Sequence, residues 1–211
     1  MAVTLLPRHP GLSATTRLQS LASDEATATL HDWMILLAAG VLAACASTFL
    51  DLNIRRVPGQ AILRVVFPMA VGLAMVPRRG TGCAMGATAL MTGMFFRYAG
   101  LKGEAMGLGA LTSLAATGPL LDWTLSRANG GWRQYLLFAL AGMSSNLLAL
   151  AVRGGAKSMG WEHAGRRPLW EWLSQASYTY IACGLVAGLV SGAILFYARE
   201  KNPSSPVEPT P

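Results

Sequence analysis

The chain has 211 residues, of which 53% are hydrophobic and 13% are charged, and its formal net charge is +7. Soluble domains carry roughly 25% charged residues, so this composition excludes an ordinary soluble protein. The apolar stretches leave no room for a separate soluble domain, and we expect a single membrane domain.

Six apolar stretches fill most of the chain. They cover residues 33–50, 60–76, 81–96, 105–121, 134–152 and 176–197. A helix of about 20 apolar residues crosses the roughly 30 Å hydrocarbon core of a bilayer. The sequence therefore predicts an all-α fold, a polytopic membrane protein in which a bundle of six transmembrane helices occupies residues 32–198.

Polar tails flank this domain. Residues 1–31 form an N-terminal tail that lacks the apolar core of a signal peptide. Residues 199–211 are rich in proline, and we expect them to be disordered. Basic residues gather at the ends of the stretches, where they contact lipid headgroups, so the net charge does not indicate nucleic acid as a partner.

The first stretch carries two rows of small residues with a spacing of four. One row is Ala39, Ala43 and Ser47, and the neighbouring row contains Gly40 and Ala44. Such rows let two helices approach closely in lipid, where packing drives association. The sequence leaves two interpretations open: a surface that docks on a partner membrane subunit, or packing inside the bundle.

The second and third stretches are short and are joined by a tight turn at 77–80, which predicts an antiparallel hairpin. Arg64 lies about one turn into the second stretch, four residues before Pro68. Proline cannot donate to the carbonyl of the residue four positions earlier, so we expect a kink. Arg64 is a candidate for substrate contact, for an ion pair or for snorkelling to the interface.

The last three stretches hold most of the polar side chains that could line a binding pocket. Asp122 follows the fourth stretch and could instead cap a helix end. Asn146 shares one side of the fifth helix with Gly142 and Arg153, next to Ser145, and could instead bond between helices. Tyr178 and Tyr180 begin the sixth and also suit an interfacial belt. Farther along, Gly184, Gly188 and Gly192 form a stripe that predicts internal packing.

The connector at 153–175 contains three tryptophans among charged residues, which favours a short helix lying at the membrane interface. No stretch contains a histidine, and the three cysteines lie in three different stretches. Neither a metal site nor a cofactor site is expected. No catalytic motif and no intramembrane pair of carboxylates occurs, so we do not expect an enzyme.

Residues 32–198 resemble the substrate-binding S components of energy-coupling factor (ECF) transporters. The resemblance rests on Ala39-xxx-Ala43 in the first stretch, on Val57-Pro58-Gly59 before the second, and on the glycine-rich later stretches. It implies a six-helix subunit in a bacterial inner membrane, with both termini cytoplasmic. It also implies a pocket for a vitamin-like molecule between the last three helices, capped by the 51–59 connector. The partners would be a transmembrane coupling subunit, docked on the first helix, and separate ATPase subunits.

Two other functions stay open: an accessory membrane protein that scaffolds a complex without a small-molecule ligand, and an intramembrane enzyme or small channel. Basic residues are equally numerous on the two sides of the predicted topology. Charge counting therefore does not orient the chain in the membrane.

Overall fold

The fold is that of a computed structural model, which describes residues 9, 12, 15–18, 29–50, 59–101, 107–127, 131–161 and 168–197. The predicted C-terminal tail beyond residue 197 lies outside this range, as do most of the N-terminal tail and residues 51–58 of the predicted cap.

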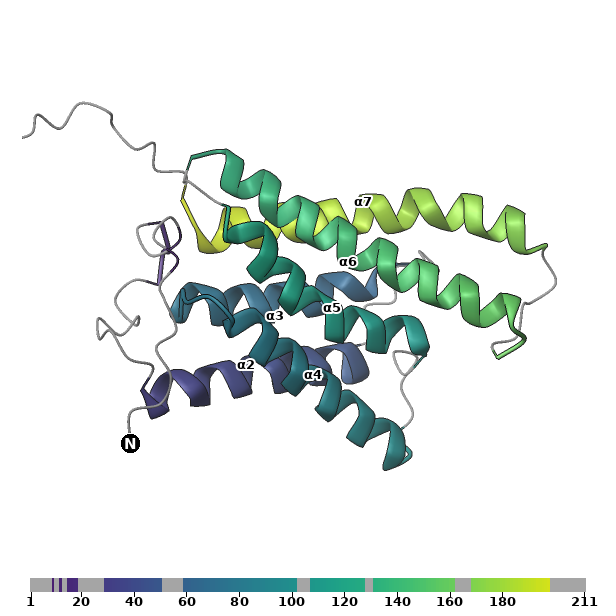
Figure 1. The fold of residues 1–211 in the computed structure, drawn as a ribbon, viewed down its shortest axis with the longest axis horizontal. Coiled ribbons are helices and arrows are strands. Elements are labelled where there is room, and N and C mark those ends of the chain that lie inside the picture. The colour runs from purple at the N-terminus through teal and green to yellow at the C-terminus, as the bar shows by residue number, and fades with distance from the viewer. Residues whose placement is uncertain are drawn as a thin grey trace, which may run out of the picture.

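Six helices make up the described chain, which confirms the all-α prediction. They are α2 (Leu30–Phe49), α3 (Ala61–Met75), α4 (Thr81–Tyr98), α5 (Leu108–Leu125), α6 (Arg133–Ser158) and α7 (Leu169–Leu195). Consecutive helices run in opposite directions (Figure 1). The bundle thus has a terminal end, where α2 begins and α7 finishes, and a distal end, where α3 begins and α4 finishes.

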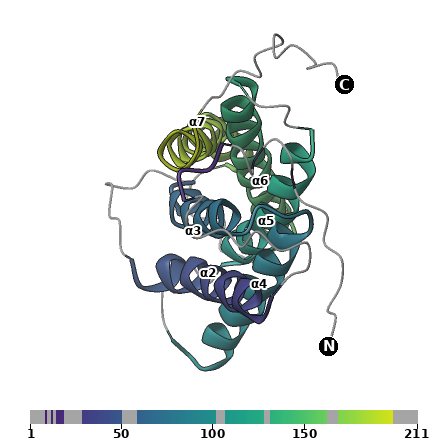
Figure 2. The same cartoon turned by 90° about the vertical axis from the view of Figure 1, so that its left-hand side faces the viewer.

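The helices lie in two layers. In the end-on view, α2, α3 and α7 form one layer and α4, α5 and α6 form the other (Figure 2). The helices α3 and α5 occupy the middle positions, with a neighbour on each side. This arrangement leaves one outer face over α2 and α3 and another over α4 and α5.

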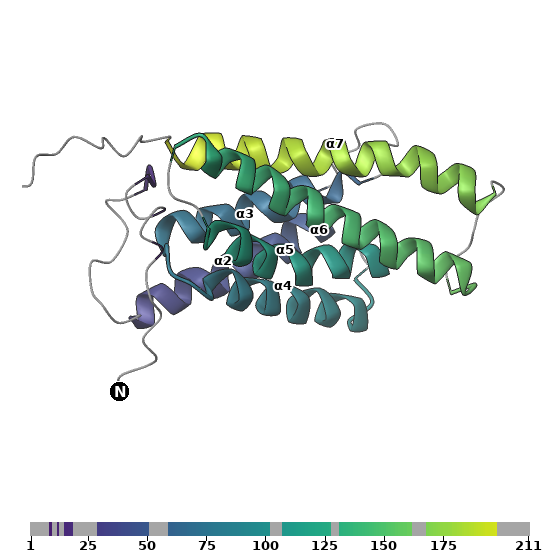
Figure 3. The same cartoon turned by 45° about the horizontal axis from the view of Figure 1, so that its top comes forward.

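Three of the helices are long and apolar enough to cross a membrane: α2, α6 and α7. The 26 residues of α6 and the 27 residues of α7 would extend about 39–40 Å, beyond the roughly 30 Å of hydrocarbon. Both helices project past the others at the distal end (Figures 1 and 3). The described chain thus contains the core of a membrane protein.

The interfacial helix predicted for 153–175 is wrong in the described part of that connector. Residues 153–158 continue α6 and residues 169–175 begin α7. Two of the three tryptophans, Trp161 and Trp170, are exposed near the ends of these extensions. Packing between α6 and α7 keeps the two segments helical beyond the apolar stretches.

Local sequence sets two helix features. Thr29 caps α2: its hydroxyl accepts from the backbone N–H of Asp32, whose carboxylate accepts from the N–H of Thr29. This reciprocal pair satisfies two donors that a helix start otherwise leaves open. In α3, Pro68 lies inside the helix as expected, and it removes one helical hydrogen bond.

Many large apolar side chains are exposed on the outside of the bundle, and glycines let its helices approach closely inside. The exposed set includes Leu37, Val41, Met91, Met94, Phe95, Leu140, Leu148, Val186, Val190 and Ile194. In the interior, glycines bring helices into backbone contact: Gly82 meets Gly118 between α4 and α5, and Gly142 meets Gly184 between α6 and α7. Water disfavours such an outer surface, whereas lipid accepts it.

The glycine stripe of α7 packs internally, as predicted. A Cβ atom added to Gly184 would lie 2.7 Å from the carbonyl oxygen of Gly142. Gly188 meets the backbone of Phe138, and Gly192 lies against its ring. The seam between α6 and α7 therefore depends on the absence of side chains at these positions.

The small-residue rows of α2 are turned into the bundle, which favours packing inside the bundle over a partner-docking surface. The five residues are all buried: Ala39, Gly40, Ala43, Ala44 and Ser47. Gly40 packs against α4, where an added Cβ would lie 2.8 Å from the Thr88 Cβ. Close helix packing thus uses these rows within the chain, which was the alternative interpretation of the same spacing.

Candidate functional site

Asn146 is the centre of a polar cluster toward the distal end of the bundle. Its side chain is 1% exposed and lies on α6, facing α7 and the start of α3. The Nδ2 group donates to the carbonyl oxygen of Tyr180 at 2.7 Å and to that of Gly59 at 3.2 Å. One amide therefore ties together three segments that are far apart in sequence.

Tyr180 forms the second part of this cluster. It is buried, and the Arg153 guanidinium donates to its hydroxyl at 3.4 Å. Gly59 has a φ of +90° and lies against the Tyr180 ring, where a Cβ would approach within 3.0 Å. This position requires glycine, both for its left-handed backbone and for the close approach of the ring.

Basic and aromatic side chains extend the cluster beyond the apolar part of α6 and α7. The Arg153 guanidinium carbon lies 5.8 Å from the centroid of the Trp172 ring, and the Lys157 Nζ lies 3.8 Å from it. Cation–π contacts of this kind fix the positions of cationic groups at an interface. The cluster thus combines a buried amide, a tyrosine hydroxyl and two positive charges.

Ser145 and Gly142 belong to the packing next to this cluster. The Ser145 hydroxyl bonds the Thr117 hydroxyl of α5 at 2.7 Å, and both side chains are buried. Gly142 lies at the seam with α7. These two predicted site residues join helices, which was the alternative considered for polar groups in the fifth stretch.

The structure does not bring Tyr178 or Arg64 to the Asn146 cluster. Tyr178 is 78% exposed on the outer side of α7, two residues from the buried Tyr180. Arg64 is partly buried on α3, and its Nε atom has no hydrogen-bond partner within the described ranges. Residues two apart on a helix point in different directions, which explains why only one of the two tyrosines reaches the cluster.

Asp122 lies in the last turn of α5, toward the terminal end, and the structure does not bring it to the Asn146 cluster. Its Oδ2 accepts from the backbone N–H of Cys83 at 2.8 Å, and its Oδ1 lies 3.7 Å from the Nε2 of His9. Because α5 and α6 are antiparallel, the end of one helix meets the start of the other. Asp122 therefore joins α5 to α4 and to the N-terminal segment.

The described residues of the N-terminal segment, 9, 12 and 15–18, contact this terminal end. The His9 backbone N–H donates to the Pro77 carbonyl at 3.0 Å, and the Thr16 hydroxyl donates to the Ala74 carbonyl at 2.7 Å. Thr15 and Arg17 bridge to the end of α7 and the chain just after it: the Arg17 N–H donates to the Leu195 carbonyl, and the Tyr197 N–H donates to the Thr15 carbonyl. These contacts were not predicted, because a polar tail gives no local signal of its tertiary partners.

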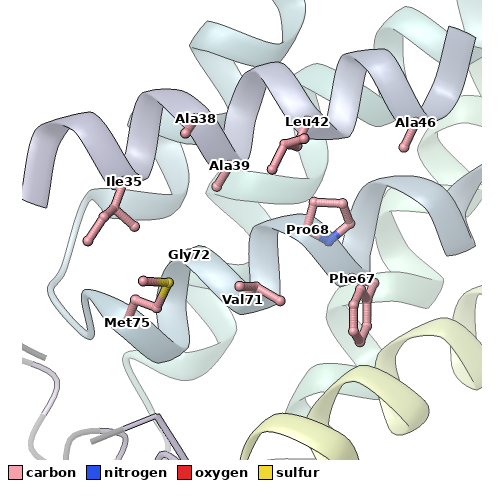
Figure 4. A pocket seen from close by; sticks show the side chains of 10 residues that line it. All are labelled: Ile35, Ala38, Ala39, Leu42, Ala46, Phe67, Pro68, Val71, Gly72 and Met75. Carbon is pink, nitrogen blue, oxygen red and sulfur yellow. The ribbon is translucent and has the colours of Figure 1, made fainter. Parts of the chain in front are cut away.

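A second feature is a groove of about 360 Å³ between α2 and α3, lined only by apolar residues and glycine. The lining side chains are Ile35, Ala38, Leu42, Phe67, Val71 and Met75, with Ala39, Ala46, Pro68 and Gly72 between them (Figure 4). Gly72 forms part of the floor, since a Cβ there would lie 2.9 Å from the Ala39 Cβ. The groove was not predicted from sequence.

The predicted site residues thus divide into three places: the Asn146 cluster, the packing seams beside it, and the terminal end. Helical spacing puts Arg153 on the same side of α6 as Asn146, but no pattern in the sequence points to the Gly59 carbonyl or to Trp172 as neighbours. Comparison of the chain with protein-family models, with curated proteins and with solved structures gives no match.

Proposed function

We propose that all six helices cross a lipid bilayer. The shorter or less apolar helices α3, α4 and α5 lie alongside the three apolar ones and run antiparallel to their chain neighbours (Figure 3). The exposed Met91, Met94 and Phe95 of α4 extend the apolar outer surface onto this part of the bundle. We further propose that this bilayer is a bacterial inner membrane and that both termini of the protein lie on its cytoplasmic side.

Within this bundle we propose a binding site for a vitamin-like small molecule at the Asn146 cluster. The single observation that carries the proposal is the buried Asn146 amide beside Tyr180, with the Arg153 guanidinium at the Tyr180 hydroxyl. Sites for small ligands combine apolar walls with a few placed polar groups. An amide donor, a phenol and a guanidinium suit a planar or carboxylate-bearing ligand.

A ligand at this site would compete with hydrogen bonds that the protein makes to itself. The Asn146 amide donates to the carbonyls of Gly59 and Tyr180, so a ligand oxygen has to displace the Gly59 carbonyl to reach Nδ2. The Tyr180 carbonyl belongs to a helix and stays in place. Binding therefore implies movement of Gly59 away from α6.

The wider proposal is that the chain is the membrane-embedded substrate-binding subunit of an importer of the ECF type. It would work with a transmembrane coupling subunit and separate ATPase subunits, and would itself be no enzyme. Three features support this interpretation. The chain has six helices, α2 begins and α7 ends at the terminal end of the bundle, and the polar cluster lies toward the distal end. Because the rows of Ala39 and Gly40 are buried, a coupling subunit would have to dock elsewhere.

The test is a thermal-shift screen of the purified full-length protein against water-soluble vitamins, followed by calorimetry on any ligand found. Tyr180→Phe should weaken binding by about tenfold, because it removes one hydrogen bond of about 1.4 kcal/mol. Tyr178→Phe is the matched control, since its ring is exposed on the outer side of the same helix. Equal effects of the two changes would place the ligand elsewhere.

A second candidate is an accessory membrane protein without a small-molecule ligand. The observation that favours it is that these polar groups already form hydrogen bonds within the protein. Asn146 donates to two backbone carbonyls, and the Ser145 hydroxyl bonds the Thr117 hydroxyl. A screen without any ligand, together with a membrane protein that stays bound through purification, would support this candidate over the binding subunit.

A further inference from the structure

The groove between α2 and α3 opens on the outer face of the bundle and carries one positive charge beyond one end. Its α3 wall consists of Phe67, Val71 and Met75 with Pro68 between them. Arg64 precedes these positions by three, seven and eleven residues, which places it on the same face of the helix. A groove with apolar walls and an arginine beyond one end matches an amphiphile, a molecule with an apolar chain and a charged head.

Arg64 is free to bind an anion from outside the described chain. Its Nε atom is buried and has no hydrogen-bond partner within the described ranges. Of the three described carboxylates, Asp32 is engaged with Arg78 and Asp122 with Cys83 and His9, both at the terminal end. The third, Glu171, is exposed in the first turn of α7. A guanidinium beside an apolar surface is stabilised by a nearby anion, and two phosphate oxygens can accept hydrogen bonds from its paired N–H donors.

The length of the groove fits one leaflet of a bilayer. From Ile35 to Ala46 its α2 wall covers eleven helical steps, or about 17 Å at 1.5 Å per residue. Half of a roughly 30 Å hydrocarbon core is about 15 Å. A partner helix that crosses the whole membrane would need a contact about twice as long, so the groove suits an acyl chain better than a transmembrane helix.

The depth of Arg64 agrees with this assignment. It is the fourth residue of α3, at the distal end, while the groove extends from there toward the terminal end. A charge at this position lies near the headgroups and the groove lies beneath it in the hydrocarbon. The cavity of about 360 Å³ is at the lower end of ligand pockets, which suits a single chain.

We propose that the α2–α3 groove holds one acyl chain of an anionic phospholipid, whose phosphate binds the Arg64 guanidinium. The inference requires only that the bundle lies in a bilayer, and it is independent of the proposed site at Asn146. It predicts a lipid that stays with the protein in detergent and that is selected by headgroup charge at one end and by chain packing along the groove.

The test is native mass spectrometry of the full-length protein in detergent, titrated with phosphatidylglycerol and, separately, with phosphatidylcholine that has the same acyl chains. The native protein should bind phosphatidylglycerol more tightly. Arg64→Gln should lower the affinity for phosphatidylglycerol about fivefold, the effect of one basic residue at a membrane surface. The variant should then bind the two lipids with equal affinity. Arg97→Gln, which removes an exposed charge at the same end, is the matched control and should preserve the preference.

A second pair of variants tests the groove itself. Ala38→Phe fills the groove and should weaken the binding of both lipids. Val41→Phe enlarges an exposed residue on another face of α2 and should leave the binding of both lipids unchanged. Equal binding of the two lipids by the native protein, or unchanged selectivity in Arg64→Gln, would overturn the proposal. So would a dimer or a bound membrane protein that dissociates in Ala38→Phe, because the occupant would then be a second copy or a partner helix.

Discussion

Asp32 at the start of α2 and Arg78 in the turn between α3 and α4 form an ion pair of 3.4 Å, and each side chain is only 2% exposed. The pair fixes the α3–α4 hairpin to the beginning of α2 at the terminal end of the bundle. The Asp32 carboxylate also accepts from the backbone N–H of Thr29, so it serves the helix cap and the ion pair together.

Breaking this pair should be strongly destabilising. Arg78→Met removes the guanidinium that pairs with the buried Asp32 carboxylate, and we expect a loss of about 3–5 kcal/mol in the free energy of unfolding. The measurement is thermal or denaturant unfolding in detergent. Adding Asp32→Asn to Arg78→Met should recover part of the loss, since the remaining buried charge is gone. The exposed neighbour provides the control: Arg79→Met should change stability by less than about 0.5 kcal/mol. Equal effects at positions 78 and 79 would contradict a buried pair.

The seam between α6 and α7 should not tolerate even one methyl group. A Cβ at Gly188 would lie 2.7 Å from the Ala139 Cα and still closer to the Phe138 carbonyl. Gly188→Ala should therefore cost about 1–3 kcal/mol through overpacking. Gly155→Ala is the matched control in a helix of the same pair, because nothing lies within 4 Å of a Cβ there. Helix propensity predicts a gain of up to about 1 kcal/mol for that change. The two unfolding midpoints should move in opposite directions.

The hydroxyl pair of Thr117 and Ser145 should couple α5 to α6 only weakly. The oxygens are 2.7 Å apart, and Thr117 also lies within hydrogen-bond distance of the Ser113 carbonyl at 2.7 Å. A double-mutant cycle with Thr117→Val and Ser145→Ala should give a coupling energy of about 0.6 kcal/mol, the average for polar pairs between membrane helices. A coupling energy near zero would show that the two hydroxyls do not support each other.

The N-terminal segment should contribute to stability through Thr16. Its hydroxyl donates to the Ala74 carbonyl at 2.7 Å, and both residues are buried. Thr16→Val should cost about 1 kcal/mol, because a buried carbonyl loses its donor. Thr48→Val is the control: that hydroxyl bonds the carbonyl one turn earlier in the same helix, an interaction that adds little. Equal losses at the two positions would argue against a specific role of the segment.

The six-span topology predicts that the two ends of α4 are reached from opposite sides of the membrane. In a variant without the native cysteines, Arg79→Cys and Tyr98→Cys place single thiols at exposed positions near the two ends of this helix. A membrane-impermeant maleimide added to sealed vesicles should label one position, and disruption of the vesicles should be needed for the other. Labelling of both from the same side would exclude α4 as a span.

The positions of the helices could be predicted from the sequence alone. The predicted stretch 33–50 corresponds to Leu30–Phe49, and 81–96 corresponds to Thr81–Tyr98. The prediction was less good at 134–152 and 176–197, since the helices extend to Ser158 and begin at Leu169. Hydropathy marks only the continuously apolar part of a helix, and these extensions contain charged residues such as Arg153, Lys157 and Glu171.

Which side of each helix faces inward was decided only by the tertiary structure. In α2, small residues could serve an outside partner or the interior, because both require close approach; the observed packing turns Gly40 toward α4. Asn146 and Asp122 are alike as isolated polar residues in or beside an apolar stretch. Their partners, Tyr180 and Gly59 for the first and Cys83 and His9 for the second, come from distant segments. Hydropathy is a property of each segment by itself, so the sequence alone determined an apolar, helical membrane protein. Hydrogen bonds and ion pairs between segments depend on how the helices are placed, and only the tertiary structure decided them.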